Sequence, residues 1–335
     1  MHPQKLKSIP LKGSRVLVTG GAGAIGSNLV ERLVQSYGCD VTVVDDYSQG
    51  HPSNLEHLLK QKEIEFIQGD INHPQILQKA FSKDVDVIYH LAASFANELS
   101  VEDPIHDLEC NIKGTLNLLK AGVKAQIKLF VYASSSSLYG PRDEILLNEN
   151  LFPNPSTPYA VSKLTGEFYC KSMKHLYDQN FVALRFSNTY GPKDFPGRYR
   201  NVIPNFMRKA LKNEPLTITG TGGETRDYTY IDDCLDGILL ASQKKEAYNQ
   251  TFNLGTGKPT RTIDLAKSIL KMTGSKSKIQ FLKPRYFDHI KYRMMDITKA
   301  SKTFGYRPQT SIEDGLEKTF AWVLGHKEDV LKSAL

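Results

Sequence analysis

Cysteine is scarce in this chain and is not arranged to cross-link or to bind metal. Only four of the 335 residues are cysteines, at positions 39, 110, 170 and 234, and no two of them form a C-x-x-C pair. The nine histidines do not stand at the spacing of metal ligands either. The sequence therefore predicts reduced thiols in a cytoplasmic protein, with neither a disulfide framework nor a metal site.

Long apolar runs are also missing. No stretch of 18 apolar residues occurs, and no long apolar run follows the lysines near the start of the chain. We therefore expect neither a membrane span nor a signal peptide.

Acidic residues are outnumbered by basic ones, 36 to 43, which gives a net charge of +7. A basic chain raises nucleic acid as a partner, because phosphate neutralisation by Lys and Arg dominates such binding. Here most lysines are single and interleaved with acids, as on a solvated surface, so nucleic acid is not expected. Apolar and charged fractions of 40% and 24% are those of a globular protein with an ample core.

What the chain does have is a glycine-rich turn between an apolar strand and a helix. Residues 15–19 predict the strand, and Gly20, Gly23 and Gly26 follow it at G-x-x-G-x-x-G spacing. Such glycines permit a tight turn and let the backbone approach a pyrophosphate, which would bind the amides at the helix N-terminus. Taken alone, the three glycines would also fit an ordinary tight turn.

A second predicted strand, residues 41–44, favours the cofactor interpretation. It ends in Asp45 and Asp46, and an acid about 20 residues past the last glycine is where a carboxylate accepts the ribose hydroxyls of NAD. A phosphate on that ribose would be repelled. The sequence therefore predicts NAD rather than NADP.

Three further positions at strand ends belong to the expected cofactor site. Asp70 lies at the end of a predicted strand and would meet the adenine, although a turn-forming Gly-Asp pair is the alternative. Ala92 and Ala93 follow the next strand and are small enough to let the cofactor approach the backbone. His90 lies inside an apolar run, which is typical of a core residue.

Strands and helices alternate from residue 15 to residue 185, which predicts an α/β fold of the Rossmann type with a doubly wound, mainly parallel sheet. The further strands are expected at residues 64–70, 85–91, 128–133, 181–185 and 251–254, and helices at 104–123, 159–177 and 262–272.

The chain also divides in sequence. We assign residues 12–187 to an NAD-binding domain, to which elements near residues 229–254 return. Residues 188–330 form a smaller C-terminal lobe for the substrate, interleaved with that domain. Residues 188–230 are richer in Gly, Pro, Asn and Arg and show no strong period.

Tyr159 and Lys163 are four residues apart on one predicted helix and so share a face. A lysine ammonium lowers the pKa of a neighbouring phenol, and a positively charged nicotinamide ring would lower it further, so Tyr159 is a candidate general base. Such pairs are common on helices. This one gains weight from Ser135, which follows the carboxyl end of a predicted strand and can point into the same cleft.

These residues resemble the extended short-chain dehydrogenase/reductases that act on nucleotide sugars, a family that includes 4-epimerases and dehydratases. The resemblance extends over about residues 14–322 and rests on four segments, TGGAGAIG at 19–26, HLAA at 90–93, ASSSSLYG at 133–140 and YAVSK at 159–163. It implies Tyr159 as base, Lys163 as its electrostatic partner and ligand of the nicotinamide ribose, and Ser135 as hydrogen-bond donor to the sugar oxygen. The cofactor-binding residues are then Gly20, Gly23, Ala24, Ile25, Gly26, Asp45, Asp46, Asp70, Ile71, Leu91, Ala92, Ala93, Asn111, Tyr159 and Lys163.

The C-terminal part resembles the family's site for a nucleoside diphosphate. Asn188 matches an asparagine that contacts the diphosphate, and Arg226 matches a phosphate-binding arginine. Arg285 and Asp288 match an Arg-x-x-Asp motif that holds phosphate and ribose, a role that suits the bidentate arginine fork. The substrate site implied consists of Ser136, Asn188, Asn201, Val202, Thr219, Arg226, Arg285 and Asp288.

Two positions depart from the family pattern. Phe95 stands where the galactose epimerases have a basic residue. The segment between Asp288 and Asp296 is one residue longer than in those enzymes, so either Tyr292 or Arg293 could face the hexose.

The resulting prediction is an NAD-dependent 4-epimerase of a nucleoside-diphosphate sugar, with a UDP-sugar favoured and a 4-keto sugar as intermediate. A 4,6-dehydratase or a UDP-glucuronate decarboxylase begins with the same oxidation, and a non-catalytic sensor of NAD and sugar nucleotide is a more distant alternative. Dehydratases of the family place an Asp-Glu pair where this chain has Ser136 and Ser137. Because the helices at 104–123 and 159–177 pair between subunits in the family, a two-fold homodimer is expected.

Overall fold

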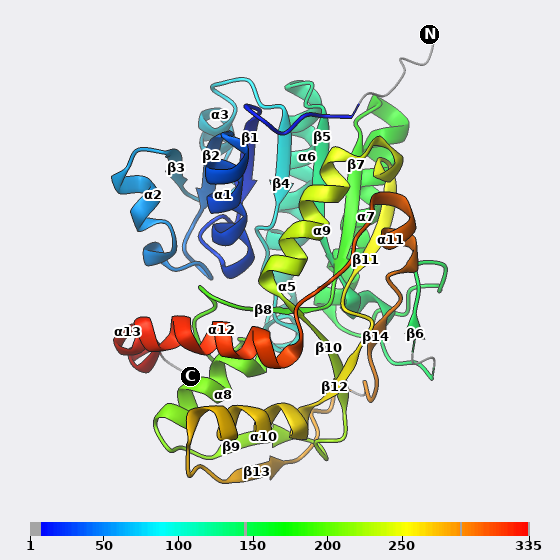
Figure 1. Cartoon of the computed structure of the whole chain (residues 1–335). Helices are drawn as coiled ribbons and strands as arrows, with labels where there is room; N and C mark the ends of the chain where they lie inside the picture. Colours follow the sequence, from blue (N-terminus) through cyan, green and yellow to red (C-terminus); the bar gives the residue numbers. More distant parts are fainter. Residues whose placement is uncertain (1–7, 144–145, 289, 334–335) are drawn as a thin grey trace.

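A seven-stranded sheet forms the centre of the molecule. The computed structural model describes residues 8–143, 146–288 and 290–333, and its strands lie in the order β11-β7-β5-β4-β1-β2-β3 (Figure 1). The strands are β1 (Arg15–Thr19), β2 (Asp40–Asp45), β3 (Ile64–Gln68), β4 (Val87–His90), β5 (Leu129–Ser135), β7 (Phe181–Phe186) and β11 (Gln250–Leu254). All neighbours are parallel, which confirms the doubly wound sheet and the return of the strand predicted at 251–254.

Helices cover both faces of this sheet. Successive strand residues point to opposite sides, and the apolar residues of the strands lie on both sides, so each face packs against helices. Val16 and Val18 of β1 pack in one core with Leu29, whereas Leu17 packs in the other with Leu118 and Cys170. The first face is covered by α1 (Ala24–Tyr37) and α9 (Ile231–Gln243), and the second by α3 (Pro74–Ala80), α6 (Gly114–Lys124) and α7 (Pro158–Tyr177) (Figure 1).

The helix predicted at residues 104–123 is confirmed, and it contains a π-helical segment. The chain is helical without a break through α5 (Pro104–Asp107), the π-helical segment (Leu108–Lys113) and α6, and the short helix α4 (Asn97–Glu102) precedes it. In the wider π turn lies Asn111, which accepts a hydrogen bond from the Ser94 amide and donates to the Ser94 carbonyl and to Asp107. A π turn shifts the side chains that follow by one position, which local apolar spacing does not reveal.

The remaining elements lie mostly beyond the carboxyl ends of the sheet strands (Figure 1). Three small sheets consist of β8 (Asn188–Tyr190), β10 (Thr225–Tyr230) and β12 (Pro259–Arg261), of β9 (Leu216–Thr219) and β13 (Ile279–Leu282), and of β6 (Leu146–Leu147) and β14 (Met294–Met295). The helices are α8 (Val202–Leu211), α10 (Thr262–Thr273), α11 (Thr298–Phe304), α12 (Ile312–Gly325) and α13 (Lys327–Lys332), with α2 (Glu56–Lys60) beside the large sheet. Short 3₁₀ turns occur at Pro52–Asn54, Ser136–Tyr139 and Lys245–Ala247.

Within the described ranges, no helix has the length and apolar character needed to cross a membrane. The assignment of residues 12–187 and 188–330 to separate domains stays a prediction.

Candidate active site

A cavity of about 750 Å³ lies where the carboxyl ends of the large sheet meet the small sheets. All three predicted catalytic residues and every predicted substrate residue line it. The predicted cofactor residues on its wall are Gly20, Gly23, Ala24, Ile25, Gly26, Asp45, Asp46, Asp70, Ile71, Leu91, Ala92, Ala93, Tyr159 and Lys163. Asn111 lies behind the wall, where it fixes the backbone of Ser94.

The glycine turn has the shape that a pyrophosphate requires. A Cβ at Gly26 would lie 2.1 Å from the Gly20 carbonyl oxygen, so α1 can approach the turn only without a side chain there. A Cβ at Gly23 would have that same oxygen, 3.3 Å away, as its one neighbour within 4 Å, so a side chain would extend into the cavity. Gly23, the N-cap of α1, has no side chain that could cap the helix, and the residues from Gly23 to Gly26 line the cavity. These residues fit the phosphates of a dinucleotide.

Asp45 is held rigidly at the end of β2. One of its carboxylate oxygens accepts a hydrogen bond from the Ala22 amide at 2.9 Å, and the other accepts one from the Tyr47 amide at 2.8 Å. Burial raises the pKa of this carboxyl, and the two amides oppose that rise. The carboxylate therefore lies fixed on the cavity wall, where it can accept hydroxyl hydrogen bonds.

The catalytic candidates come from α7 and from the end of β5. The Thr157 hydroxyl caps α7 and Pro158 begins it, and Tyr159 in the first turn lies on the cavity wall. The Lys163 ammonium donates to the Ala133 carbonyl at 3.0 Å and lies 5.8 Å from the centre of the Tyr159 ring. Burial lowers the pKa of Lys163 to about 8, although Asp107 opposes this.

Burial acts on the Tyr159 phenol in the direction opposite to that expected of Lys163, whose lowering of the phenol pKa together with the nicotinamide ring stays a prediction. Burial raises the pKa of the phenol to about 12, and a hydrogen bond with Ser135 lowers it only in part. The ammonium of Lys163 is directed to the Ala133 carbonyl rather than to the phenol oxygen. Spacing on a helix predicts a shared face, but it does not predict how deeply that face is buried.

A buried ion pair fixes α7 one turn beyond Lys163. Glu167 of α7 accepts hydrogen bonds from Arg185 of β7 at 2.9 and 2.8 Å, and from the Ser134 hydroxyl at 2.6 Å. Arg185 also donates to the Tyr139 hydroxyl at 2.8 Å. This network joins α7 to two sheet strands, so the side chains of its first turns are held in place.

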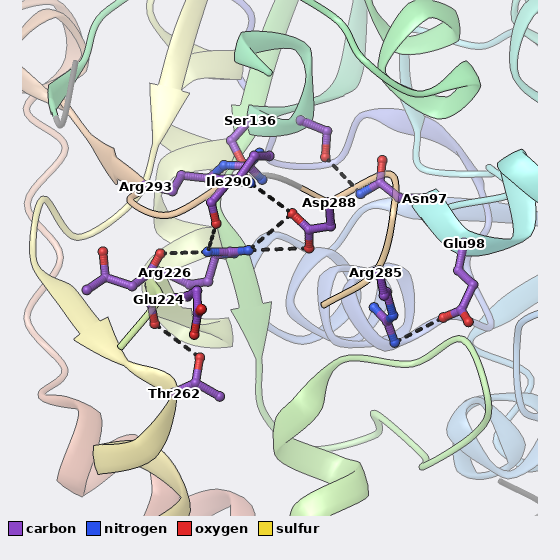
Figure 2. Close-up of polar contacts among 12 residues, drawn as sticks. Asn97, Glu98, Ser136, Glu224, Arg226, Thr262, Arg285, Asp288, Ile290 and Arg293 are labelled. Carbon is purple, nitrogen blue, oxygen red and sulfur yellow. Dashed lines mark hydrogen bonds and ion pairs between the residues drawn. The ribbon is translucent and has the colours of Figure 1, made fainter. Parts of the chain in front are cut away.

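On the opposite wall, two of the predicted arginines are paired with acids (Figure 2). Arg226 lies 3.4 Å from Asp288 and donates to the Ile290 carbonyl at 3.0 Å. Arg285 pairs with Glu98 at 3.0 Å. The predicted phosphate-binding residues Arg226 and Arg285 thus line the same cavity, and each of them forms an ion pair with an acidic side chain.

Three further arginines, Arg198, Arg200 and Arg293, line the cavity and were not assigned to the site from the sequence. Arg293 is 5% exposed and lies on the cavity wall, whereas Tyr292 is 48% exposed and is not among the lining residues; which of them faces the hexose stays a prediction. The Arg200 guanidinium lies 4.8 Å from the centre of the Phe95 ring. The positive charge of Arg200 therefore lies beside Phe95, the position where the family pattern has a basic residue. Because residues 95 and 200 are far apart in the sequence, the residues around Phe95 could not have predicted this contact.

Comparisons with known proteins agree with this geometry. Residues 16–255 match the model of the NAD dependent epimerase/dehydratase family. A putative UDP-glucose 4-epimerase of Methanocaldococcus jannaschii is 35% identical over 310 residues, which are 92% of this chain and 98% of that protein. The solved structure of an epimerase from Methanothermobacter thermautotrophicus is 36% identical, covers both chains in full and superposes with a TM-score of 0.94.

Two other solved structures relate the fold to bound ligands. A UDP-glucuronic acid 4-epimerase from Bacillus cereus, in complex with UDP-glucuronic acid and NAD, is 32% identical over 93% of this chain and 99% of that one, with a TM-score of 0.86. A dTDP-glucose 4,6-dehydratase from Streptomyces venezuelae with NAD bound is 29% identical over 94% and 98%, with a TM-score of 0.87. The matches therefore include both epimerases and a dehydratase.

Proposed function

The chain belongs to the NAD-dependent epimerase/dehydratase family and is an NAD-dependent nucleotide-sugar epimerase; we propose that it inverts C4 of a UDP-sugar. One observation carries the proposal. Ser135, Tyr159 and Lys163 lie on the wall of the same cavity that the glycine turn opens into from one side and Arg226 and Arg285 line from the other.

Each of these residues has a role in the proposed reaction. NAD, when bound, would supply the acceptor and later the donor of the C4 hydride, and its positively charged ring would favour the phenolate of Tyr159. The Ser135 hydroxyl donates a hydrogen bond to the sugar oxygen, and Tyr159 accepts the hydroxyl proton. Lys163, anchored on the Ala133 carbonyl, supplies positive charge below the phenol ring.

The arginines hold the nucleotide while the sugar moves. Arg226 and Arg285 bind the diphosphate, because a guanidinium fork pairs phosphate at two oxygens. Asp45 accepts the ribose hydroxyls of the cofactor at the other end of the cavity. With the diphosphate fixed and the hexose less tightly held, the 4-keto sugar can turn and present its opposite face.

The residues after Ser135 favour epimerisation over dehydration. Elimination of water across C5 and C6 needs a base for the C5 proton and an acid for the leaving hydroxyl. Here the two positions are Ser136 and Ser137, both buried on the cavity wall, and a serine hydroxyl is poor in either role at neutral pH. Return of the hydride to C4 is then expected to be faster than elimination of water from the 4-keto sugar.

The experiment is to incubate the enzyme with UDP-glucose, UDP-N-acetylglucosamine, UDP-glucuronate and the corresponding GDP, CDP and dTDP sugars, and to measure product masses. We expect an isomer of unchanged mass from at least one UDP-sugar. A main product that has lost water would contradict the proposal and indicate a dehydratase. A main product that has lost carbon dioxide would indicate a decarboxylase.

We also propose that two copies of the chain associate. Ile105 and Leu108 are 66% and 47% exposed before α6, and Val161 and Phe168 are 46% and 57% exposed on α7. These large apolar side chains lie on neighbouring segments of one face of the molecule, next to a shallow groove lined by both. A two-fold homodimer would cover them.

A further inference from the structure

Arg293 is a buried cation that pairs with no carboxylate among the described residues. Its side chain is 5% exposed and lies on the cavity wall, and its one hydrogen bond runs from Nη1 to the Ser136 hydroxyl at 3.5 Å. Its Nε and Nη2 atoms have no hydrogen-bond partner within the described residues. A buried charge whose donors are unsatisfied is costly, so the site is incomplete as the protein alone provides it.

The neighbouring acids do not supply the missing acceptor. Asp288, the acid nearest to this part of the wall, directs its two oxygens to Arg226 at 3.5 and 3.4 Å. Glu98 pairs with Arg285. Within the described residues, Arg293 thus lacks the direct carboxylate contact that Arg226 and Arg285 each have on this wall.

The position of Arg293 is at the hexose end of the cavity. It contacts Ser136, the residue directly after Ser135, which we propose donates to the sugar oxygen. In Figure 2, Arg293 and Ser136 lie on one side of the Arg226–Asp288 pair, and Arg285 with Glu98 lies on the other. Arg293 is therefore separate from the pair of arginines proposed for the diphosphate.

We propose that Arg293 selects a sugar nucleotide whose hexose carries a carboxylate, which would bind the guanidinium fork beside the Ser136 hydroxyl. The inference rests on the proposed function and names its substrate class. A planar guanidinium matches the two oxygens of a carboxylate, and such charge-assisted pairs are roughly twice as strong as neutral hydrogen bonds. A neutral hexose offers hydroxyl oxygens that can accept hydrogen bonds, but it brings no negative charge to pair with the buried guanidinium of Arg293. A uronate is therefore preferred to the corresponding neutral sugar.

The test measures dissociation constants of UDP-glucuronate, UDP-glucose and UDP for the full-length, NAD-loaded enzyme by titration calorimetry. We expect wild type to bind UDP-glucuronate at least about tenfold more tightly than UDP-glucose. Arg293→Gln should abolish that preference and leave the affinity for UDP within about twofold, and Arg293→Lys should restore part of it. Tyr292→Phe, at the exposed neighbouring position, is the matched control and should retain the full preference.

Two results would overturn the inference. The first is equal or weaker binding of UDP-glucuronate by wild type, a comparison that does not depend on any variant folding. The second is an equal loss of UDP and UDP-glucuronate affinity in Arg293→Gln, which would make Arg293 a diphosphate ligand. Because these are binding constants, they are independent of the product masses that test 4-epimerisation.

Discussion

At the scale of single residues, the site depends on how burial acts on each titrating group. The Tyr159 phenol is buried and its pKa is raised to about 12, whereas burial lowers the pKa of Lys163 to about 8. A hydrogen bond with Ser135 offsets part of the rise in the pKa of Tyr159. The protein therefore holds a neutral phenol next to a serine donor, and it keeps the lysine charge close by.

The first prediction concerns the base. Tyr159→Phe removes the proton acceptor and keeps the ring that packs on the cavity wall, so turnover should fall by about 100-fold or more. The affinities for NAD and for the sugar nucleotide should stay close to wild type. Steady-state rates with binding titrations of both ligands would check this. A variant that retains more than about a tenth of the rate would show that another group accepts the proton.

At the scale of elements, the sequence indicates those parts of the site that local chemistry determines. β1, the glycine turn and α1 follow from glycine spacing and apolar period, and α7 follows from its Thr157 cap and Pro158. Parallel strands then bring Asp45 and Ser135 to the same edge, as predicted. These elements carry most of the cofactor-facing wall.

Other elements could not be predicted because distant contacts create them. α8 has a buried face with Ile203, Phe206 and Met207, but Pro204 interrupts its pattern in the sequence. Arg293 reaches the cavity wall just before β14, a two-residue strand that pairs with β6 far away in the chain. A strand of two residues has no periodicity that a sequence pattern could reveal. The sequence therefore named Arg293 only as one of two candidates, together with Tyr292.

The second prediction concerns the opposite edge of the sheet. Asp86, before β4, accepts a hydrogen bond from the Arg15 amide at 2.9 Å and pairs with Lys128 at 2.8 Å. Burial alone would raise its pKa, but the hydrogen bonds from Lys128 and Arg15 outweigh burial and lower the pKa to about 2, from 3.8. The carboxylate thus stabilises the folded state above about pH 4, and this contribution is lost as the pH falls towards 2.

Asp86→Asn should therefore lower the free energy of unfolding at pH 7 by about 1 kcal/mol, a figure reduced for the exposure of both cationic partners. The variant should also lose less stability than wild type between pH 4 and pH 2. Denaturant unfolding at several pH values would measure both effects. Asp84→Asn is the control, because Asp84 pairs with Arg15 at the exposed surface, and it should change little. Equal stability of Asp86→Asn and wild type at pH 7 would contradict the account.

At the scale of the whole molecule, two regions of the fold differ in the side chains they present. The carboxyl ends of the sheet meet the small sheets around the cavity, which all the predicted catalytic and substrate residues line. Another region, formed by α5, the π-helical segment and α7, exposes large apolar side chains. The same helix thus carries Tyr159 on its buried side and Phe168 on its exposed side.

The third prediction is that light scattering at micromolar concentration gives the mass of two chains. Phe168→Asp should shift the equilibrium to the monomer, because a charge would have to be buried in the shared apolar face. Leu324→Asp on α12, which is exposed on a different helix, should leave the dimer intact. A wild-type monomer under these conditions would rule the dimer out.

The central claim is that hydrogen leaves C4 and returns to C4. The most direct measurement uses UDP-sugars labelled with deuterium at C4 and locates the label in the product by NMR and mass spectrometry. The account predicts the 4-epimer with the deuterium still at C4 and the mass unchanged. Deuterium found at C6 with loss of water, or exchanged into solvent, would contradict it.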